Sequence, residues 1–244
     1  MKTVIANQSI IDATSLKPIA TELLLRSHQG VELAEFLTYP SLFIEHLSDL
    51  TDSKVLFVFE LMKTYPSHVY FVNYTPGQIA HEDFIKILGR YSKAGIPASS
   101  IGLEITEATP IACWATLKEN LKIARALGFH IIIDDFTQGN SNLKALLEIN
   151  PNVVKLDMSI IQGAEHCNRH RALLNASVRL IHEMGAKVVI EGIETAQQLN
   201  LARISGADML QGFFISKPDV YLPPTGEQLQ KPACSHRPIL VSVH

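Results

Sequence analysis

Eight short apolar segments recur along the chain, and stretches with helical spacing separate most of them. The segments are residues 3–12, 20–26, 69–73, 101–106, 129–136, 153–157, 186–191 and 207–211. Regular alternation of strand and helix predicts a parallel sheet, and eight such units within 244 residues predict a closed α/β barrel. An open doubly wound sheet is the alternative, which is weakened because the chain has no glycine-rich phosphate fingerprint.

The intervening stretches predict the helices and the limits of the domain. Helical spacing covers residues 33–50, 55–65, 78–94, 110–127, 141–149, 164–184 and 195–204. From Pro218 onward the chain is rich in proline and polar residues. We therefore expect a barrel over residues 1–218 and a peripheral C-terminal tail over residues 219–244.

Residues 129–136, Phe-His-Ile-Ile-Ile-Asp-Asp-Phe, show the strand pattern most clearly. A β-branched run of this length, bounded by turn residues, is typical of a strand buried on both faces. Asp134 and Asp135 follow at the point where the strand would leave the sheet. Two carboxylates about 4 Å apart repel by roughly 4 kcal/mol at an effective dielectric constant near 20, so such a pair is tolerable at a strand end if cations lie beside it.

Polar side chains also end most of the other predicted strands. The strand-end set comprises Glu22, Asn73, Glu104, Asp134, Asp135, Lys155, Asp157, Glu191 and Gln211. A single strand-end acid is more often a turn former or a helix N-cap than a ligand. In a barrel, however, the carboxyl ends of the strands meet at one mouth, where such folds place active sites. Because most of the predicted strands end in a polar side chain, the whole set predicts a functional site at this mouth.

The strand-end set predicts a site for divalent metals. Lys155 supplies one positive charge against many carboxylates, and the set holds no Cys or His. Oxygen ligands favour Mg²⁺ or Mn²⁺ over Zn²⁺, and adjacent Asp134 and Asp135 suit two ions that share a carboxylate. Lys155 has two readings that the residues alone leave open. In the first, Lys155 is neutralised by its neighbour Asp157 and has no further role. In the second, it is a cation that orients the nucleophilic water or stabilises the phosphorane-like charge.

Composition narrows the class of protein. The chain is 47% hydrophobic with a net charge of −3, which argues against a general binder of nucleic-acid polymers or anionic membranes. Its three cysteines form no close pair in the sequence, as fits a reducing compartment. The longest apolar stretch, residues 55–62, contains Glu60 and is too short to span a bilayer. We therefore expect a cytoplasmic protein without a membrane span.

Seven ordered motifs resemble a known family. They are Glu22-Leu-Leu-Leu-Arg26, Val72-Asn73, Leu103-Glu-Ile-Thr-Glu107, Asp134-Asp-Phe136, Lys155-Leu-Asp157, Glu191-Gly-Ile-Glu194 and Gln211-Gly212. Their order and spacing over residues 4–218 resemble the EAL domain, a family that hydrolyses the bacterial second messenger cyclic di-GMP. The signature tripeptide reads Glu-Leu-Leu here, which keeps the acid. The resemblance implies a modified TIM (β/α)8 barrel whose first strand is antiparallel, and hydrolysis of one phosphodiester to linear pGpG.

The resemblance also implies roles for individual residues. The ligands of two divalent cations are matched by Glu22, Asn73, Glu104 and Asp134 for the first, and by Asp134, Asp135 and Glu191 for the second. The other catalytic positions, beside the attacking water and phosphate, are matched by Lys155, Gln211, Asp157 and Glu194. Substrate-binding positions are matched by Gln8, Leu24 and Arg26. Glu107 matches an acid that anchors the loop after Asp135.

That loop departs from the family pattern and leaves an alternative function open. Residues 137–142 read Thr-Gln-Gly-Asn-Ser-Asn where the family usually has Gly-Thr-Gly-Tyr-Ser-Ser. Thr137 is β-branched and tolerates positive φ badly, and the loop is implicated in metal-site geometry and dimer coupling. An active phosphodiesterase is the leading hypothesis because every ligand is present. A catalytically weak EAL-like module that binds cyclic di-GMP or a protein partner is the alternative, and an unrelated metal-dependent barrel enzyme would require seven accidental matches.

Regulation is expected to come from outside the barrel. The sequence carries no sensory or cyclase motif before the first strand, so we expect control by expression, by oligomerisation or by a protein partner. The resemblance implies a homodimer.

Overall fold

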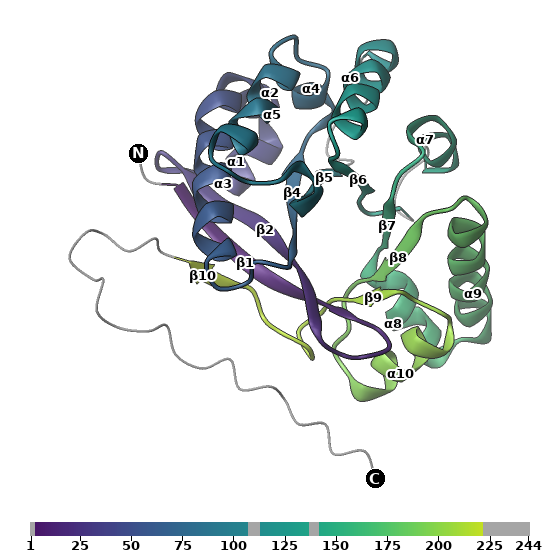
Figure 1. Ribbon diagram of the computed structural model, residues 1–244. Helices are drawn as coiled ribbons and strands as arrows, with labels where there is room; N and C mark the ends of the chain where they lie inside the picture. Colours follow the sequence, from purple (N-terminus) through teal and green to yellow (C-terminus); the bar gives the residue numbers. More distant parts are fainter. Residues whose placement is uncertain (1–2, 107–112, 137–141, 222–244) are drawn as a thin grey trace, which may run out of the picture.

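The computed structural model describes residues 3–106, 113–136 and 142–221, which form a closed barrel of eight strands with helices around it (Figure 1). The barrel strands are β1 (Thr3–Asp12), β2 (Pro18–His28), β4 (Val69–Tyr74), β5 (Ile101–Ile105), β6 (His130–Ile133), β7 (Val153–Leu156), β8 (Lys187–Ile190) and β9 (Met209–Leu210). Neighbours pair in parallel from β2 round to β9, and β1 closes the barrel between β9 and β2. The predicted α/β barrel is confirmed, and the open doubly wound sheet is wrong.

The first strand runs antiparallel to both of its neighbours, as the family resemblance implies. A short turn joins β1 to β2, and Asp12 fixes it by accepting hydrogen bonds from the Ser15 backbone N–H at 2.6 Å and hydroxyl at 2.7 Å. Two short strands extend the sheet, since β3 (Val31–Glu32) pairs with β2 and β10 (Asp219–Tyr221) pairs with β1. The start of the predicted tail therefore pairs with the barrel, whereas residues 222–244 lie outside the described part of the chain.

The helices between β3 and β4 differ from the predicted division. They are α1 (Leu33–Thr38), α2 (Ser41–Glu45) and α3 (Leu47–Met62). The expectation of one helix over 33–50 and another over 55–65 is wrong. Pro40 has no backbone N–H to donate, so the helix is interrupted there. No proline or glycine lies between Leu47 and Met62, and α3 therefore continues through the expected gap.

Two later helices are also divided differently from the prediction. The remaining helices are α4 (Pro76–Ile79), α5 (Phe84–Lys93), α6 (Trp114–Ala126), α7 (Asn142–Ile149), α8 (Met158–His166), α9 (Asn168–Glu183) and α10 (Ala196–Ile204). A 3₁₀ turn, Ala98–Ser100, precedes β5. The predicted helices over 78–94 and 164–184 are each two helices, because the chain turns between α4 and α5 and is extended at Cys167. Within the described ranges, no helix is both long and apolar enough to cross a membrane.

The interior of the barrel is filled by one small or apolar residue from each strand, which we call the lumen layer. It consists of Ile10, Ala20, Phe71, Gly102, Ile132, Val153, Val189 and Met209. Gly102 belongs to this layer because a Cβ at its position would overlap the Ile132 side chain. A second and larger apolar core lies between the barrel and the surrounding helices. The lumen layer closes the barrel below the site described next.

Candidate active site

A polar layer lies directly above the lumen layer, and the strand period places it there. Side chains two positions apart on a strand share a face. Each residue of this polar layer lies two positions along the chain from the lumen-layer residue of its own strand. On β1, which runs in the opposite direction, the polar residue precedes the lumen-layer residue. We call this layer the polar ring, and it consists of Gln8, Glu22, Asn73, Glu104, Asp134, Lys155, Glu191 and Gln211.

The Lys155 ammonium group lies at the centre of the polar ring. Its Nζ atom is 2.6 Å from Glu104 Oε1, 2.7 Å from Glu191 Oε1, 3.2 Å from Glu22 Oε2 and 3.3 Å from Asp134 Oδ1. Four other strands therefore supply carboxylates to one cation, which neutralises the lysine more fully than a single neighbour on its own strand would. The ring retains an excess of negative charge.

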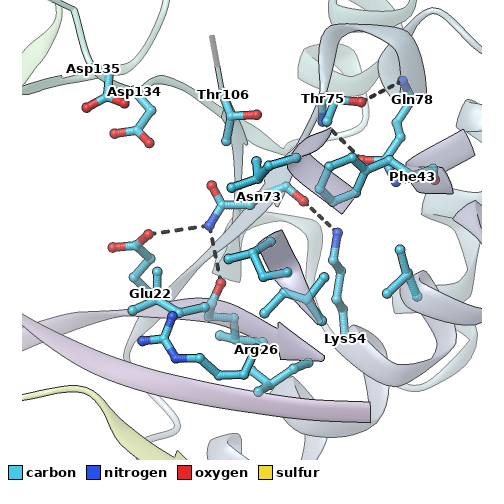
Figure 2. A pocket seen from close by; sticks show the side chains of 17 residues that line it. Glu22, Arg26, Phe43, Lys54, Asn73, Thr75, Gln78, Thr106, Asp134 and Asp135 are labelled. Atoms are coloured by element: carbon cyan, nitrogen blue, oxygen red, sulfur yellow. Dashed lines mark hydrogen bonds between the residues drawn. The ribbon is translucent and has the colours of Figure 1, made fainter. Parts of the chain in front are cut away.

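Amide side chains hold the carboxylate of Glu22 in place. Gln211 Nε2 donates to Glu22 Oε2 at 2.6 Å and to Gln8 Oε1 at 3.1 Å, and Asn73 Nδ2 donates to Glu22 Oε1 at 3.3 Å. Gln8 donates in turn to the Ser216 carbonyl at 2.8 Å. Figure 2 shows Glu22, Asn73 and Asp134 pointing toward the same part of the adjoining cavity. Side chains from β1, β2, β4 and β9 thus form one connected network.

Burial raises the pKa values of Glu104 and Glu191, because charge is poorly solvated inside the barrel. Burial, then the neighbouring Glu22, raises the pKa of Glu104 well above its usual range. Burial raises the pKa of Glu191 to about 8 against the opposing effect of Lys155. Burial alone would lower the pKa of Lys155, but the surrounding carboxylates outweigh it and raise that pKa well above its ordinary value. The ring therefore favours added positive charge.

The acidic residues fit divalent cations. Ligand oxygens of Asp134, Asp135 and Glu191 all lie within 4.8 Å of one another. Asp135 has a φ of +50°, so the chain turns sharply after β6 and keeps both aspartates at the mouth. Burial, then the adjacent Asp134, raises the pKa of Asp135 to about 6. Among the described residues, the buried oxygen Glu104 Oε2 accepts no hydrogen bond, and Asp134 Oδ1 has only its ion pair with Lys155 at 3.3 Å. Buried oxygens in this state are suited to an ion.

Two cavities flank the polar ring. The larger, of about 600 Å³, is lined by Glu22, Asn73, Asp134 and Asp135, and by the predicted substrate contacts Leu24 and Arg26 (Figure 2). The smaller, of about 270 Å³, is lined by Gln8, Asp135, Asp157, Glu191, Glu194 and Gln211. The structure thus brings together every described residue of the predicted site.

Two predicted supporting residues also have structural roles. The Asp157 carboxylate caps α8 by accepting a hydrogen bond from the Ser159 N–H at 2.9 Å. Glu194 donates its backbone N–H to Gln198 Oε1 at 2.7 Å, and Gln198 belongs to the capping box of α10. Glu107 and residues 137–141 of the unusual loop lie outside the described residues. Their predicted roles remain predictions.

Lys54 is a member of the site that the motifs do not reveal. It lines the larger cavity, is 7% exposed, and donates to the Asn73 carbonyl at 2.5 Å. Its Nζ atom lies 3.9 Å from the centre of the Tyr74 ring. Burial lowers the pKa of Lys54 to about 7. The sequence signal for the burial of Lys54 was its helical spacing in α3. It lies three residues before Phe57 and four before Val58, and both of these are buried.

Comparison with known proteins agrees with this geometry. The sequence model of the EAL domain matches residues 2–218. The chain is 32% identical over 123 residues to the cyclic di-GMP phosphodiesterase RocR of Pseudomonas aeruginosa. This aligned segment covers 50% of this chain and 31% of RocR. It is 30% identical over 148 residues to the signaling protein YkoW of Bacillus subtilis, covering 60% of this chain and 18% of YkoW. The matched segment is therefore less than a third of either relative.

Solved structures give the same result for the fold. The manganese and cyclic di-GMP complex of Klebsiella pneumoniae BlrP1 matches with a TM-score of 0.78 and 27% identity, over 90% of this chain and 57% of that chain. The closed barrel, its antiparallel first strand and the match over residues 2–218 lead to one assignment. This chain belongs to the EAL domain family.

Proposed function

We propose that this chain hydrolyses cyclic di-GMP to linear pGpG with two bound divalent ions, Mg²⁺ or Mn²⁺. The observation that carries the proposal is the cluster of four carboxylates around Lys155, beside a cavity of about 600 Å³. The relatives support the same substrate class, since RocR is named a cyclic di-GMP phosphodiesterase and BlrP1 was solved with manganese and this nucleotide.

The acidic and amide residues divide into two ligand sets. Glu22, Asn73, Glu104 and Asp134 would hold one ion, and Asp134, Asp135 and Glu191 would hold the other. Ions bound there would lower the pKa of a water molecule and neutralise charge on the phosphodiester. Gln211 supports the first set because it donates to Glu22 at 2.6 Å.

The remaining residues bind and orient the reactants. The Lys155 ammonium would donate a hydrogen bond to the attacking water once ions share its carboxylate partners. Arg26 would bind a non-reacting phosphate oxygen, and Leu24 would contact a guanine base beside it. Gln8, Asp157 and Glu194 line the smaller cavity on the other side of the ring. The water oxygen bonds to phosphorus, the bond from phosphorus to a ribose 3′ oxygen breaks, and that oxygen takes up a proton.

The alternative is a binding module that has lost turnover through the altered loop after Asp135. It would use the same cavity and the same arginine, so binding alone does not separate the two functions. The cytoplasmic location, a homodimer and a protein partner also stay predictions.

A turnover assay with labelled water tests the proposal. The purified chain, stripped of metal with EDTA and resupplied with Mg²⁺ or Mn²⁺, should convert cyclic di-GMP to pGpG. In heavy-oxygen water one labelled oxygen should enter the new 5′-phosphate. Binding without product would support the alternative, and neither binding nor product would contradict the assignment to this nucleotide.

A further inference from the structure

A second group of metal-binding side chains lies away from the polar ring, where the end of β2 meets the start of α3. His28 is the last residue of β2, His46 immediately precedes α3, and Asp49 lies in the first turn of that helix. Ligand atoms of the three residues all lie within 4.8 Å of one another. We call this group the His–Asp cluster. His28 is fully buried, whereas His46 and Asp49 are partly exposed, so the cluster is open to solvent on one side.

A chain of hydrogen bonds fixes the tautomer of His28. The Ser53 hydroxyl donates its one proton to the Asp49 carbonyl at 3.0 Å, so in its 2.7 Å contact with Thr3 the threonine hydroxyl is the donor. Thr3 Oγ1 therefore accepts from His28 Nδ1–H at 2.8 Å. His28 carries its proton on Nδ1, and Nε2 presents a lone pair.

The lone pair of His28 is buried without a hydrogen-bond partner among the described residues. Buried polar atoms in this state are uncommon and call for an explanation. The Phe36 ring packs beside both imidazoles, with centroid distances of 6.5 Å to His28 and 5.8 Å to His46. Gln29 Nε2 donates to Asp49 Oδ2 at 3.2 Å and orients that carboxylate.

We propose that the His–Asp cluster binds a divalent transition metal, with zinc as the best match. Two imidazole nitrogens and one carboxylate are a three-ligand zinc set that leaves a fourth position for water. Thr3 Oγ1 accepts a hydrogen bond from the far ring nitrogen of His28, and metal-bound histidines usually donate their other N–H to an outer partner in this way. Tetrahedral zinc ligands lie roughly 3.3 Å apart, which partly exposed His46 and Asp49 can reach by small side-chain movements.

Such an ion would join two walls of the larger cavity. β2 carries Glu22 and Arg26, and α3 carries Lys54, all of which line that cavity. The cluster therefore lies where a bound metal would fix the distance between the strand and the helix. This inference is independent of the proposed phosphodiesterase activity.

Zinc titration of the intact chain against a chromophoric chelator, in excess Mg²⁺, tests the inference. The wild-type chain should bind one zinc ion tightly, and His46→Ala and Asp49→Asn should each weaken that binding by about tenfold or more. Two control variants should retain it: His130→Ala changes a histidine outside the cluster, and Asp135→Asn changes a carboxylate beside the polar ring. Zinc should also raise the Tm of the wild type and not of His46→Ala.

Three results would overturn the inference. One is a wild-type chain that binds no zinc under these conditions. Another is zinc binding that both cluster variants retain. The third is zinc binding that Asp135→Asn alone abolishes, which would place the ion at the acidic residues Asp134, Asp135 and Glu191. Circular dichroism checks that each variant is folded. His46 and Asp49 are both partly exposed, so if one of the two variants fails to fold, the other still tests the inference.

Discussion

Lys155 Nζ lies 2.6 Å from Glu104 Oε1, and neither side chain is more than 1% exposed. Removing one partner of a buried ion pair usually costs about 3–5 kcal/mol, because the other charge is left uncompensated. We expect Lys155→Met to destabilise the metal-free chain by that order, since it leaves four carboxylates together. Glu104→Gln should cost less, because Lys155 keeps three acidic partners. Urea unfolding in EDTA measures both, and a larger loss in Glu104→Gln would contradict the account.

The raised pKa values of Asp135 and Glu191 predict how metal-free stability depends on pH. Their folded-state pKa values of about 6 and about 8 exceed the ordinary values of 3.8 and 4.5, so the folded chain binds more protons than the unfolded chain. The free energy of unfolding should therefore fall as pH rises from about 4 toward 7, whereas above that range the loss of the Lys54 proton opposes the fall. Asp135→Asn should flatten the lower part of this dependence. Urea unfolding in EDTA across this range checks it, and stability that rises through the same window in wild type would contradict it.

The same protons compete with metal ions. Because ligands must lose their protons to bind a metal, Mn²⁺ affinity should rise with pH. Between pH 6 and pH 8 we expect roughly a tenfold gain per pH unit from Glu191 alone. Calorimetric titration of the wild type and Glu191→Gln measures the slope. Equal slopes in the two proteins would show that another group is responsible.

Gly192 lies between two acids of the site, Glu191 and Glu194. Its φ is +66°, and a Cβ there would overlap the Met158 side chain and lie 3.0 Å from Met158 Cα. Gly185 is the matched control, because its φ is +80° but a Cβ there would meet nothing within 4 Å. We expect Gly185→Ala to cost about 1 kcal/mol of stability and to leave activity unchanged. Gly192→Ala should cost more and reduce Mn²⁺ affinity, as denaturation and metal titration would show, and equal behaviour of the two variants would be inconsistent with this expectation.

Arg26 is a positively charged side chain of β2 that lines the larger cavity. A charge-assisted hydrogen bond to phosphate contributes about 1.5–3 kcal/mol, so Arg26→Ala should raise the KM for cyclic di-GMP by roughly ten- to a hundredfold. Mn²⁺ affinity should stay unchanged, because Arg26 contributes no oxygen ligand. Lys86→Ala removes a charge from an 83% exposed side chain and serves as the control. A fall in kcat at constant KM would assign Arg26 a different role.

The polar ring was predictable from the sequence because its positions follow the strand period. Asp134 and Glu191 each follow an apolar run and Glu104 lies one residue before the end of its strand, and parallel strands bring such ends to one mouth. The antiparallel first strand came from the family resemblance, since a residue pattern of period two is the same in either direction.

Other features depended on contacts that no local pattern encodes. Lys54 stands in an amphipathic helix where a lysine is ordinarily solvated, and its burial became evident only from the packing of α3. The His–Asp cluster joins residues from β2 and α3 through a bridge by way of Thr3 and Ser53. The division of the predicted helix over 33–50 followed from Pro40, a signal that was present in the sequence.

Hydrolysis of cyclic di-GMP by the wild type, Glu22→Ala and Lys155→Ala, each assayed with Mn²⁺ and checked for folding, tests the central claim most directly. The wild type should form pGpG only with metal present. Both variants should lose turnover by about a hundredfold or more, because each removes charge from the reacting centre. A variant that hydrolyses cyclic di-GMP at the wild-type rate would show that the polar ring is not where the reaction occurs.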